Sequence, residues 1–208
     1  MKYTLTVCTA LVLLPTVLGC GPKVMIPPVI DLKQHEVIGM IQFESSNQGQ
    51  LGPLTTRKFM EEARRDQGMV RIVELGSEED VLKAVGRDRL DQAAFKAIGE
   101  KYEINTIITG ELLVSDVKPD IKITPGFGFM NFSAKVNATL TAQMIETETG
   151  ASIWSSSANT TESVGEVSIF GGKHFVFDAE DPEKAYGKLV DALVEETTED
   201  FRVSWERG

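Results

Sequence analysis

The sequence has little cysteine, little histidine and a shortage of basic residues. Of 208 residues, two are Cys and two are His, and 21 Lys and Arg stand against 31 Asp and Glu, which gives a formal charge of −10. This acidity argues against nucleic-acid binding, which needs clustered cations to replace counterions, and against a basic patch docked on anionic lipid. The hydrophobic and charged fractions, 42% and 25%, are ordinary and exclude collagen-like or wholly disordered chains. One globular domain with an appended segment is expected.

The first twenty residues predict a secretory signal peptide. A single lysine near the start is followed by residues 3–18, which carry no charge. The run is short for a bilayer-spanning helix and is interrupted by Pro15. Its end, the sequence VLGC at 17–20, resembles the bacterial lipobox, which implies cleavage before Cys20 and a diacylglycerol on its thiol. The alternative is an ordinary secretory signal followed by an incidental cysteine.

Lipidation at Cys20 would decide both the redox chemistry and the location of the protein. Cleavage removes Cys8 and the lipid blocks Cys20, so no thiol remains for a disulfide, a metal or a nucleophile. Several acyl chains, such as palmitate, give firm membrane anchoring. By resemblance to known lipoproteins, Gly21 in place of an aspartate favours the outer membrane, with the chain facing the periplasm.

The chain divides into three parts. Residues 1–19 are the predicted signal peptide, and residues 20–36 are a lipidated cysteine followed by a tether that contains three prolines. Proline-rich linkers are extended and semi-rigid. Residues 37–208 form the predicted domain.

Hydrophobic periodicity in that domain predicts a mixed, largely antiparallel sheet with helices packed on it, of α/β or α+β class. Apolar runs at 37–43 and 105–115 are typical of buried strands, and the alternation at 69–75 predicts a further strand. Strict alternation over 132–144 predicts a long strand that returns antiparallel after a turn at 148–150, forming one long β-hairpin. Helices are expected from Pro53 to Gly68, after an N-cap at Ser77, over 89–102, and after an N-cap at Asp181 as a C-terminal helix.

Two segments carry a family resemblance. IGEKYEINTIITGEL at 98–112 is a helix that leads into a buried strand, and MIETETGASIWS at 144–155 is an antiparallel pair whose turn needs Gly150. Together with the order of elements over 37–203, they resemble the CsgG family of bacterial outer-membrane lipoproteins. The resemblance implies a non-catalytic envelope protein. The family includes a ring-forming exporter of curli subunits, and LpoB-like relatives that activate penicillin-binding proteins through partner contacts.

The pore hairpins of the ring-forming member would correspond here to insertions at about 118–136 and 162–178. Both are short, and Pro119, Pro125 and Gly126 are expected to interrupt the first ascending strand, since proline removes a ladder hydrogen bond. A partner-binding role therefore fits the short insertions better than a spanning pore. The phenylalanines concentrated in them are either partner or membrane contacts or inward-facing core residues: Phe127, Phe129, Phe132, Phe170, Phe175 and Phe177.

No pattern of catalytic, cofactor-binding or metal-binding residues emerges. His174 near Asp178 is interpreted as a hairpin surface residue, because no nucleophile or second base has a defining motif. The glycines at 126–128 and 171–172 lack the full phosphate-loop patterns. The last helix carries acids that form either a solvated face or a docking face for a basic partner: Asp191, Glu195, Glu196, Glu199 and Asp200.

We therefore expect a non-catalytic outer-membrane lipoprotein, held by lipid on Cys20 and facing the periplasm. It would act as an envelope assembly, secretion or regulatory factor by contacting an envelope protein or copies of itself, without a cofactor. An oligomeric secretion pore of the curli-export type is the alternative. An envelope hydrolase is a further alternative that no residue pattern motivates.

Overall fold

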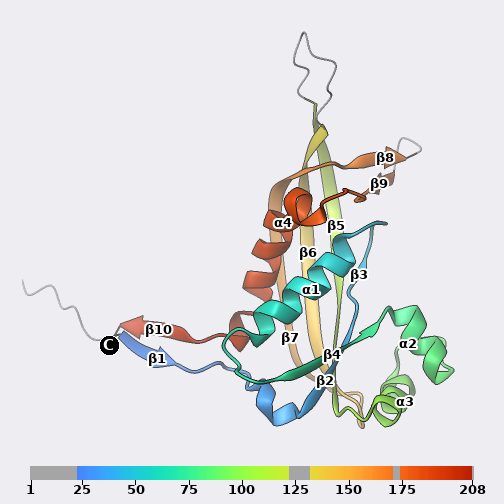
Figure 1. The fold of residues 1–208 in the computed structure, drawn as a ribbon, viewed down its shortest axis with the longest axis vertical. Coiled ribbons are helices and arrows are strands. Elements are labelled where there is room, and N and C mark those ends of the chain that lie inside the picture. Colours follow the sequence, from blue (N-terminus) through green and yellow to red (C-terminus); the bar gives the residue numbers. More distant parts are fainter. Residues whose placement is uncertain (1–22, 122–131, 171–173, 208) are drawn as a thin grey trace, which may run out of the picture.

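A mixed sheet forms the centre of the molecule (Figure 1). The structure, a computed structural model, describes residues 23–121, 132–170 and 174–207. The strand order is β4-β2-β5-β6-β7, with β3 beside β5; β2, β3 and β4 pair parallel to their neighbours, whereas β5, β6 and β7 are antiparallel. The predicted α+β class is confirmed. The strands are β2 (Val37–Ile41), β3 (Glu44–Ser45), β4 (Arg71–Gly76), β5 (Thr106–Ile121), β6 (Phe132–Glu146) and β7 (Ser152–Gly165).

The long alternating run forms β6, as predicted. Its even-numbered residues from Ala134 to Met144 are buried, and its odd-numbered residues point to the other face. By contrast, β5 is longer than the predicted strand and continues through Pro119, which pairs with Ala134. The expected interruption at Pro119 is therefore wrong. Because β2 and β3 pair with β5 only up to Leu112, this end of β5 is an edge, where the missing N–H of proline costs no ladder hydrogen bond.

Among the described residues four helices pack on the sheet, and two of them begin at predicted N-caps. They are α1 (Leu51–Arg64), α2 (Glu78–Val85), α3 (Gln92–Tyr102) and α4 (Pro182–Thr197). Helix α1 begins two residues before the predicted Pro53, after Gln50, which makes no side-chain cap bond. Ser77 and Asp181 accept hydrogen bonds from the backbone of the first turns of α2 and α4, as expected. The predicted helix over 89–102 starts later, because Asp91 caps it through Ala94 N–H.

Two separate cores lie on opposite faces of the sheet. The larger one lies between the sheet and α1 and α4, and it includes Ile38 and Met40 of β2. The smaller one includes Ile41 of the same strand together with Phe95 and Ile98 of α3. Because side chains alternate along a strand, this division means that α2 and α3 pack on the face opposite to α1 and α4. They cover only its lower end (Figure 1).

Part of the predicted tether is packed against the domain. Strand β1 (Lys23–Ile26) pairs antiparallel with β10 (Ser204–Arg207) near the other end of the chain. The short 3₁₀ helix η1 (Leu32–His35) follows, and its Leu32 is 1% exposed in the larger core. This apolar side chain fixes η1 against the domain. The prediction of a tether over 20–36 is therefore wrong for the described residues 30–36, and the fold begins before Val37. A second 3₁₀ helix, η2 (Glu199–Phe201), precedes β10.

A small antiparallel pair, β8 (Ser168–Phe170) and β9 (His174–Val176), lies where the second hairpin is expected. Its predicted turn at Gly171 and Gly172 lies outside the described residues, as do 122–131 of the first insertion. Within the described part of the chain, no helix is long and apolar enough to cross a membrane.

Candidate functional site

The six predicted contact phenylalanines do not share one environment. Phe127 and Phe129 lie outside the described residues, Phe132 begins β6 opposite Ile121, and Phe170 ends β8 opposite His174. Phe175 packs partly buried against the larger core, and Phe177 is fully buried within it, its ring 5.4 Å from that of Tyr186. A predicted contact surface must therefore exclude Phe177.

The backbone explains why Phe177 turns inward. Its N–H donates to the carbonyl of Gln48 at 3.0 Å, and its carbonyl accepts from Gln50 N–H at 2.7 Å. These bonds hold the chain after β9 against the loop before α1. The side chain consequently lies between that loop and α4, which corresponds to the inward-facing alternative from the sequence.

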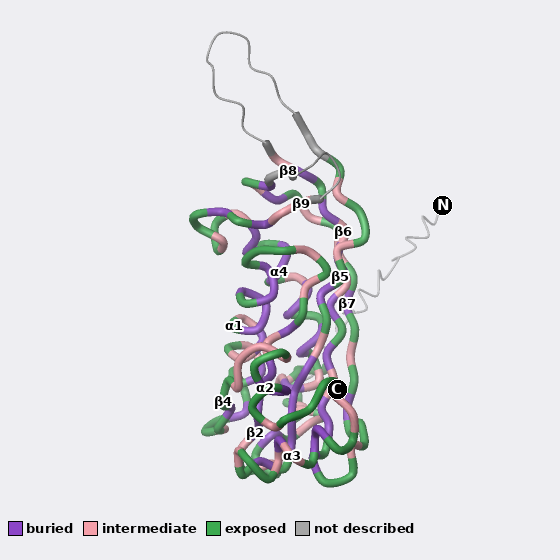
Figure 2. Tube along the Cα trace, turned by 90° about the vertical axis from the view of Figure 1, so that its right-hand side faces the viewer, coloured by how far each residue is buried: buried purple, intermediate pink, exposed green. Residues whose placement is uncertain are grey.

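The uncovered face of β5, β6 and β7 is a polar surface. In Figure 2, α1 and α4 lie on one side of these strands, and no described element covers the other side of their upper parts. We call this surface the open face. Its exposed or half-buried side chains are Glu111, Leu113, Lys135, Asn137, Thr139, Thr141, Ser155, Ser157, Asn159, Thr161 and Ser163.

Cross-strand rows of hydroxyl and amide groups organise the open face. Asn159 Nδ2 donates to Thr139 Oγ1 at 2.7 Å, and Asn137 Nδ2 donates to Thr161 Oγ1 at 2.8 Å. The hydroxyl oxygens of Thr141 and Ser157 lie 3.1 Å apart. Such pairs stabilise neighbouring strands and fix the side chains of each row. Hydroxyl and amide groups also keep spare donors and acceptors for a ligand.

An acidic pocket lies at the lower end of the open face, where the layer formed by α2 and α3 ends. It has a volume of about 560 Å³. Carboxylates of Glu44, Glu78 and Glu111 line it, and Leu90 and Phe95 form an apolar wall. Burial raises the pKa of the Glu78 carboxyl, and the negative charge of Glu44 raises it further. A cation entering the pocket would relieve this repulsion.

The pocket suits a lysine or arginine side chain better than a metal ion. Such a side chain can lay its methylene groups along Leu90 and Phe95 and place its charge at the carboxylates. Across the described ranges, no group of three or more His, Cys, Asp or Glu side chains is placed to hold a metal. No sequence pattern reveals this pocket, because its acids come from three separate elements. The one local signal was Glu111, an acid inside an apolar strand.

Strand β7 gives the open face a free edge. In the part of the chain that the structure describes, β7 pairs with β6 alone. Its fourteen residues contain neither lysine nor proline, which proteins use to protect exposed edges. The backbone groups of such an edge can pair with an added strand.

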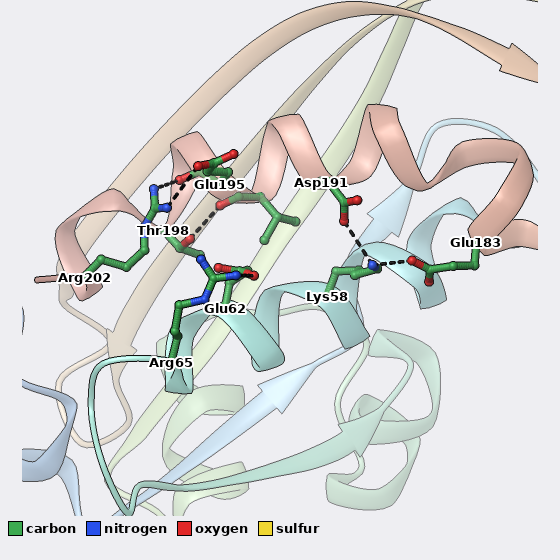
Figure 3. Close-up of polar contacts among 9 residues, drawn as sticks. Lys58, Glu62, Arg65, Glu183, Asp191, Glu195, Thr198 and Arg202 are labelled. Carbon is green, nitrogen blue, oxygen red and sulfur yellow. Dashed lines mark hydrogen bonds and ion pairs between the residues drawn. The ribbon is translucent and has the colours of Figure 1, made fainter.

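The seam between α1 and α4 is also rich in charge, but its charges pair with one another (Figure 3). Lys58 pairs with Glu183 and lies 3.1 Å from Asp191, Arg65 pairs with Glu62, and Arg202 with Glu195. The hydrogen bond from Lys58 lowers the pKa of Glu183, and the same bond raises the pKa of Lys58. Lys58 joins α1 to α4, whereas the Arg65 pair lies at the end of α1 and the Arg202 pair joins α4 to the segment after it. We interpret these charges as structural contacts rather than as a binding site.

The acids of the last helix were predicted as a solvated face or a docking face. Asp191 pairs with Lys58 of α1, and Glu195 pairs with Arg202. Asp200 accepts a hydrogen bond from Trp154 Nε1 at 2.9 Å. Three of the five acids therefore have structural partners, which favours the open face over α4 as the candidate site.

The histidines stand apart from the pocket. His35, which the sequence placed in the tether, lies with Nδ1 2.9 Å from Thr106 Oγ1. Burial lowers its pKa, although nearby Asp31 opposes the shift. His174 belongs to β9, and its side chain lies outside the described part of the structure.

Comparisons with known proteins find only distant structural similarity. No protein-family model matches the chain, and no curated protein matches it. Among solved structures, it is similar to PelC from the dodecamer of Paraburkholderia phytofirmans, with 9% identity, a TM-score of 0.47, and coverage of 87% of this chain and 96% of that chain.

Two further structures show a comparable likeness. The LpoB C-terminal domain from Salmonella enterica has 12% identity and a TM-score of 0.40, over 66% of this chain and 86% of that chain. Lipoprotein GNA1162 from Neisseria meningitidis has 13% identity and a TM-score of 0.38, over 61% of this chain and 83% of that chain. These likenesses assign no family, so membership of the CsgG family stays a prediction from the sequence.

Proposed function

We propose that this protein is a lipid-anchored, non-catalytic protein of the bacterial envelope that binds a partner protein across its open face. Cys20 holds it at the outer membrane, facing the periplasm, and it serves there as an assembly, secretion or regulatory factor. The observation that carries the proposal is the combination of an uncovered polar face, a free strand edge and an acidic pocket on one side of the sheet.

The chemistry of this side favours a partner protein that carries an extended segment and a basic residue. The backbone of such a segment can pair with the free edge of β7, and its side chains can then lie over the Ser, Thr and Asn rows. A lysine or arginine in another part of the partner, lying over the lower end of the open face, would reach Glu44 and Glu78. The net charge of −10 would also attract a basic partner before contact.

A photocrosslinking amino acid at Ser157 tests the partner surface in intact cells. Lys188, which is exposed on α4 on the covered side, is the matched control position. We expect a discrete adduct from Ser157 and none from Lys188. The double variant Glu78→Gln, Glu111→Gln should weaken the Ser157 adduct, because the pocket then lacks two of its carboxylates. Equal adducts from both positions, or none from Ser157 in folded protein, would contradict the proposal.

The anchor is tested separately. The Cys20→Ala chain, exported behind a cleavable leader that is not a lipoprotein leader, should appear in the soluble periplasmic fraction. The native chain, handled in parallel, should sediment with outer membranes. Unchanged membrane association of the variant would show that something other than lipid on Cys20 holds the protein.

A further inference from the structure

Strands β1 and β10 form a two-stranded ribbon that projects from the body of the molecule (Figure 1). The register pairs Lys23 with Arg207 and Met25 with Trp205. Because residues two apart point to the same side of a strand, and paired residues share a face, these four side chains lie together on one face of the ribbon. We call it the ribbon face.

The ribbon face is not covered by the rest of the described structure. Met25 is 55% exposed and Trp205 is 60% exposed. A two-stranded ribbon without a covering layer is marginally stable in water, and exposed Trp and Met side chains forgo the free energy of burial. The fold nevertheless fixes the base of the ribbon, through Ile30 N–H to the carbonyl of Asp200 at 3.0 Å and the amide of Gln67. Both faces of the ribbon are exposed, and the ribbon face is the one that combines Met25 and Trp205 with two cations, which indicates a surface made for contact.

The chemistry of the ribbon face matches the headgroup region of a bilayer. Lys23 and Arg207 lie directly opposite each other, an arrangement that is unfavourable unless an anion neutralises them. A phosphate group would do so. Trp205 beside them is the side chain most typical of membrane interfaces, where its ring meets the acyl boundary and its N–H meets water. The chain as a whole is acidic, but Glu206, the acid of β10, pairs with Val24 and therefore belongs to the other face of the ribbon.

The position of the anchor identifies the occupant. Cys20 precedes Lys23 by three residues, a stretch that reaches at most about 11 Å even when fully extended. Lipid on Cys20 would therefore hold the ribbon within reach of the headgroups. We propose that the ribbon lies flat on the membrane, with Lys23 and Arg207 on lipid phosphates and Met25 and Trp205 at the acyl boundary. This inference rests on the lipid anchor of the proposed function.

The ribbon would add a second, protein-borne membrane contact to the anchoring that the acyl chains provide. It also changes the role of the segment after Cys20. Instead of a tether that lets the domain rotate freely, the ribbon would set a fixed orientation of the domain on the membrane surface.

Trp205 makes the contact measurable, because the chain has only two tryptophans. The native lipidated protein carrying Trp154→Phe is reconstituted into vesicles of phosphatidylethanolamine and phosphatidylglycerol that contain lipid brominated on its acyl chains. We expect a blue shift of Trp205 emission and its quenching by bromine. In the matched Trp205→Phe protein, Trp154 is buried and bonded to Asp200, so its emission should not be quenched.

The double variant Lys23→Gln, Arg207→Gln on the Trp154→Phe background should lose much of the quenching while still floating with the vesicles. If the native protein floats but Trp205 stays unquenched, the ribbon proposal is overturned and the anchor stands. A blue shift that depends on protein concentration and not on lipid would also overturn it, in favour of contact between two copies.

Absence of lipid on Cys20 can be distinguished from failure of the ribbon contact. If the native chain carries no lipid, the proposed function fails, and the unlipidated Cys20→Ala protein is then added to the same vesicles. Quenching of Trp205 in that protein would support the ribbon by itself. Absence of quenching, in protein shown to be folded by circular dichroism, would overturn the ribbon as well.

Discussion

Replacing Gln67 should loosen both ends of the chain at once. Gln67 follows α1 and is 1% exposed. Its Oε1 accepts from Leu32 N–H at 2.9 Å, and its Nε2 donates to the carbonyl oxygens of Ile30 at 2.7 Å and Phe201 at 2.8 Å. One amide side chain therefore joins the segment before β2 to the segment after α4. Gln67→Ala removes all three hydrogen bonds.

The loss of stability in Gln67→Ala depends on which of the three former partners of Gln67 stay buried without a hydrogen bond. Leu32 and Phe201 are almost fully buried, whereas Ile30 is half-exposed and water can replace its lost partner. A buried polar group left unpaired costs about 1–3 kcal/mol. Two such groups therefore predict a loss of about 2–6 kcal/mol in the free energy of unfolding. In a domain of this size each kcal/mol lowers the Tm by about 2–4 °C.

Urea denaturation measures this loss, and hydrogen exchange at the Leu32 amide locates it. Gln34→Ala, at an exposed position in η1, is the matched control and should change stability by less than about 0.5 kcal/mol. Gln67→Glu should be destabilising at neutral pH, because a carboxylate then faces two carbonyl oxygens, and should recover on acidification as the protonated acid becomes a donor. If Gln67→Ala unfolds like the native protein and Leu32 stays protected, the reasoning is refuted.

Two further predictions concern pH and backbone geometry. Burial lowers the pKa of His35 below its ordinary value of 6.5, so the unfolded chain binds the proton more readily than the folded one. The free energy of unfolding should therefore fall as the pH drops below about 6.5. Urea titrations at pH 7 and pH 5 should show a smaller fall for His35→Gln than for the native protein. An equal fall in both proteins would exclude His35 as its source. Gly49 has φ 120°, and an added Cβ would lie 2.0 Å from the carbonyl oxygen of Phe177, so Gly49→Ala should cost more than about 2 kcal/mol. Gly165→Ala, where the added carbon meets nothing within 4 Å, should be close to neutral by the same denaturation assay, and equal stability of the two variants would argue against this close approach.

Local patterns were enough to predict most of the elements. The period-two run over 132–144 predicted β6, because a strand with one buried face must alternate. Ser77 and Asp181 predicted the starts of α2 and α4, because an N-cap bonds to backbone groups only a few residues away. These signals depend on neighbours in the chain and are therefore visible in the sequence.

The candidate surfaces were not visible in this way. The acidic pocket takes its carboxylates from three elements: Glu44, Glu78 and Glu111. They come together only because the layer formed by α2 and α3 ends at the open face. Pro119 was expected to break β5, yet it lies at an edge, a property set by where β2 and β3 end. The sequence allows Phe177 to be a surface or a core residue. Its backbone bonds to the loop before α1 place the side chain in the core.

Periodicity, capping, the acidity of the chain and the lipobox-like residues before Gly21 follow from the order of the amino acids alone. Only the tertiary structure placed Lys23 opposite Arg207, converting a predicted tether into a ribbon, and left one face of β5, β6 and β7 uncovered. The difference lies in how far apart in the chain the interacting residues are. Turns, caps and amphipathic periods are set by interactions within a few residues, whereas pairing across more than 180 positions depends on the whole fold first bringing those strands together.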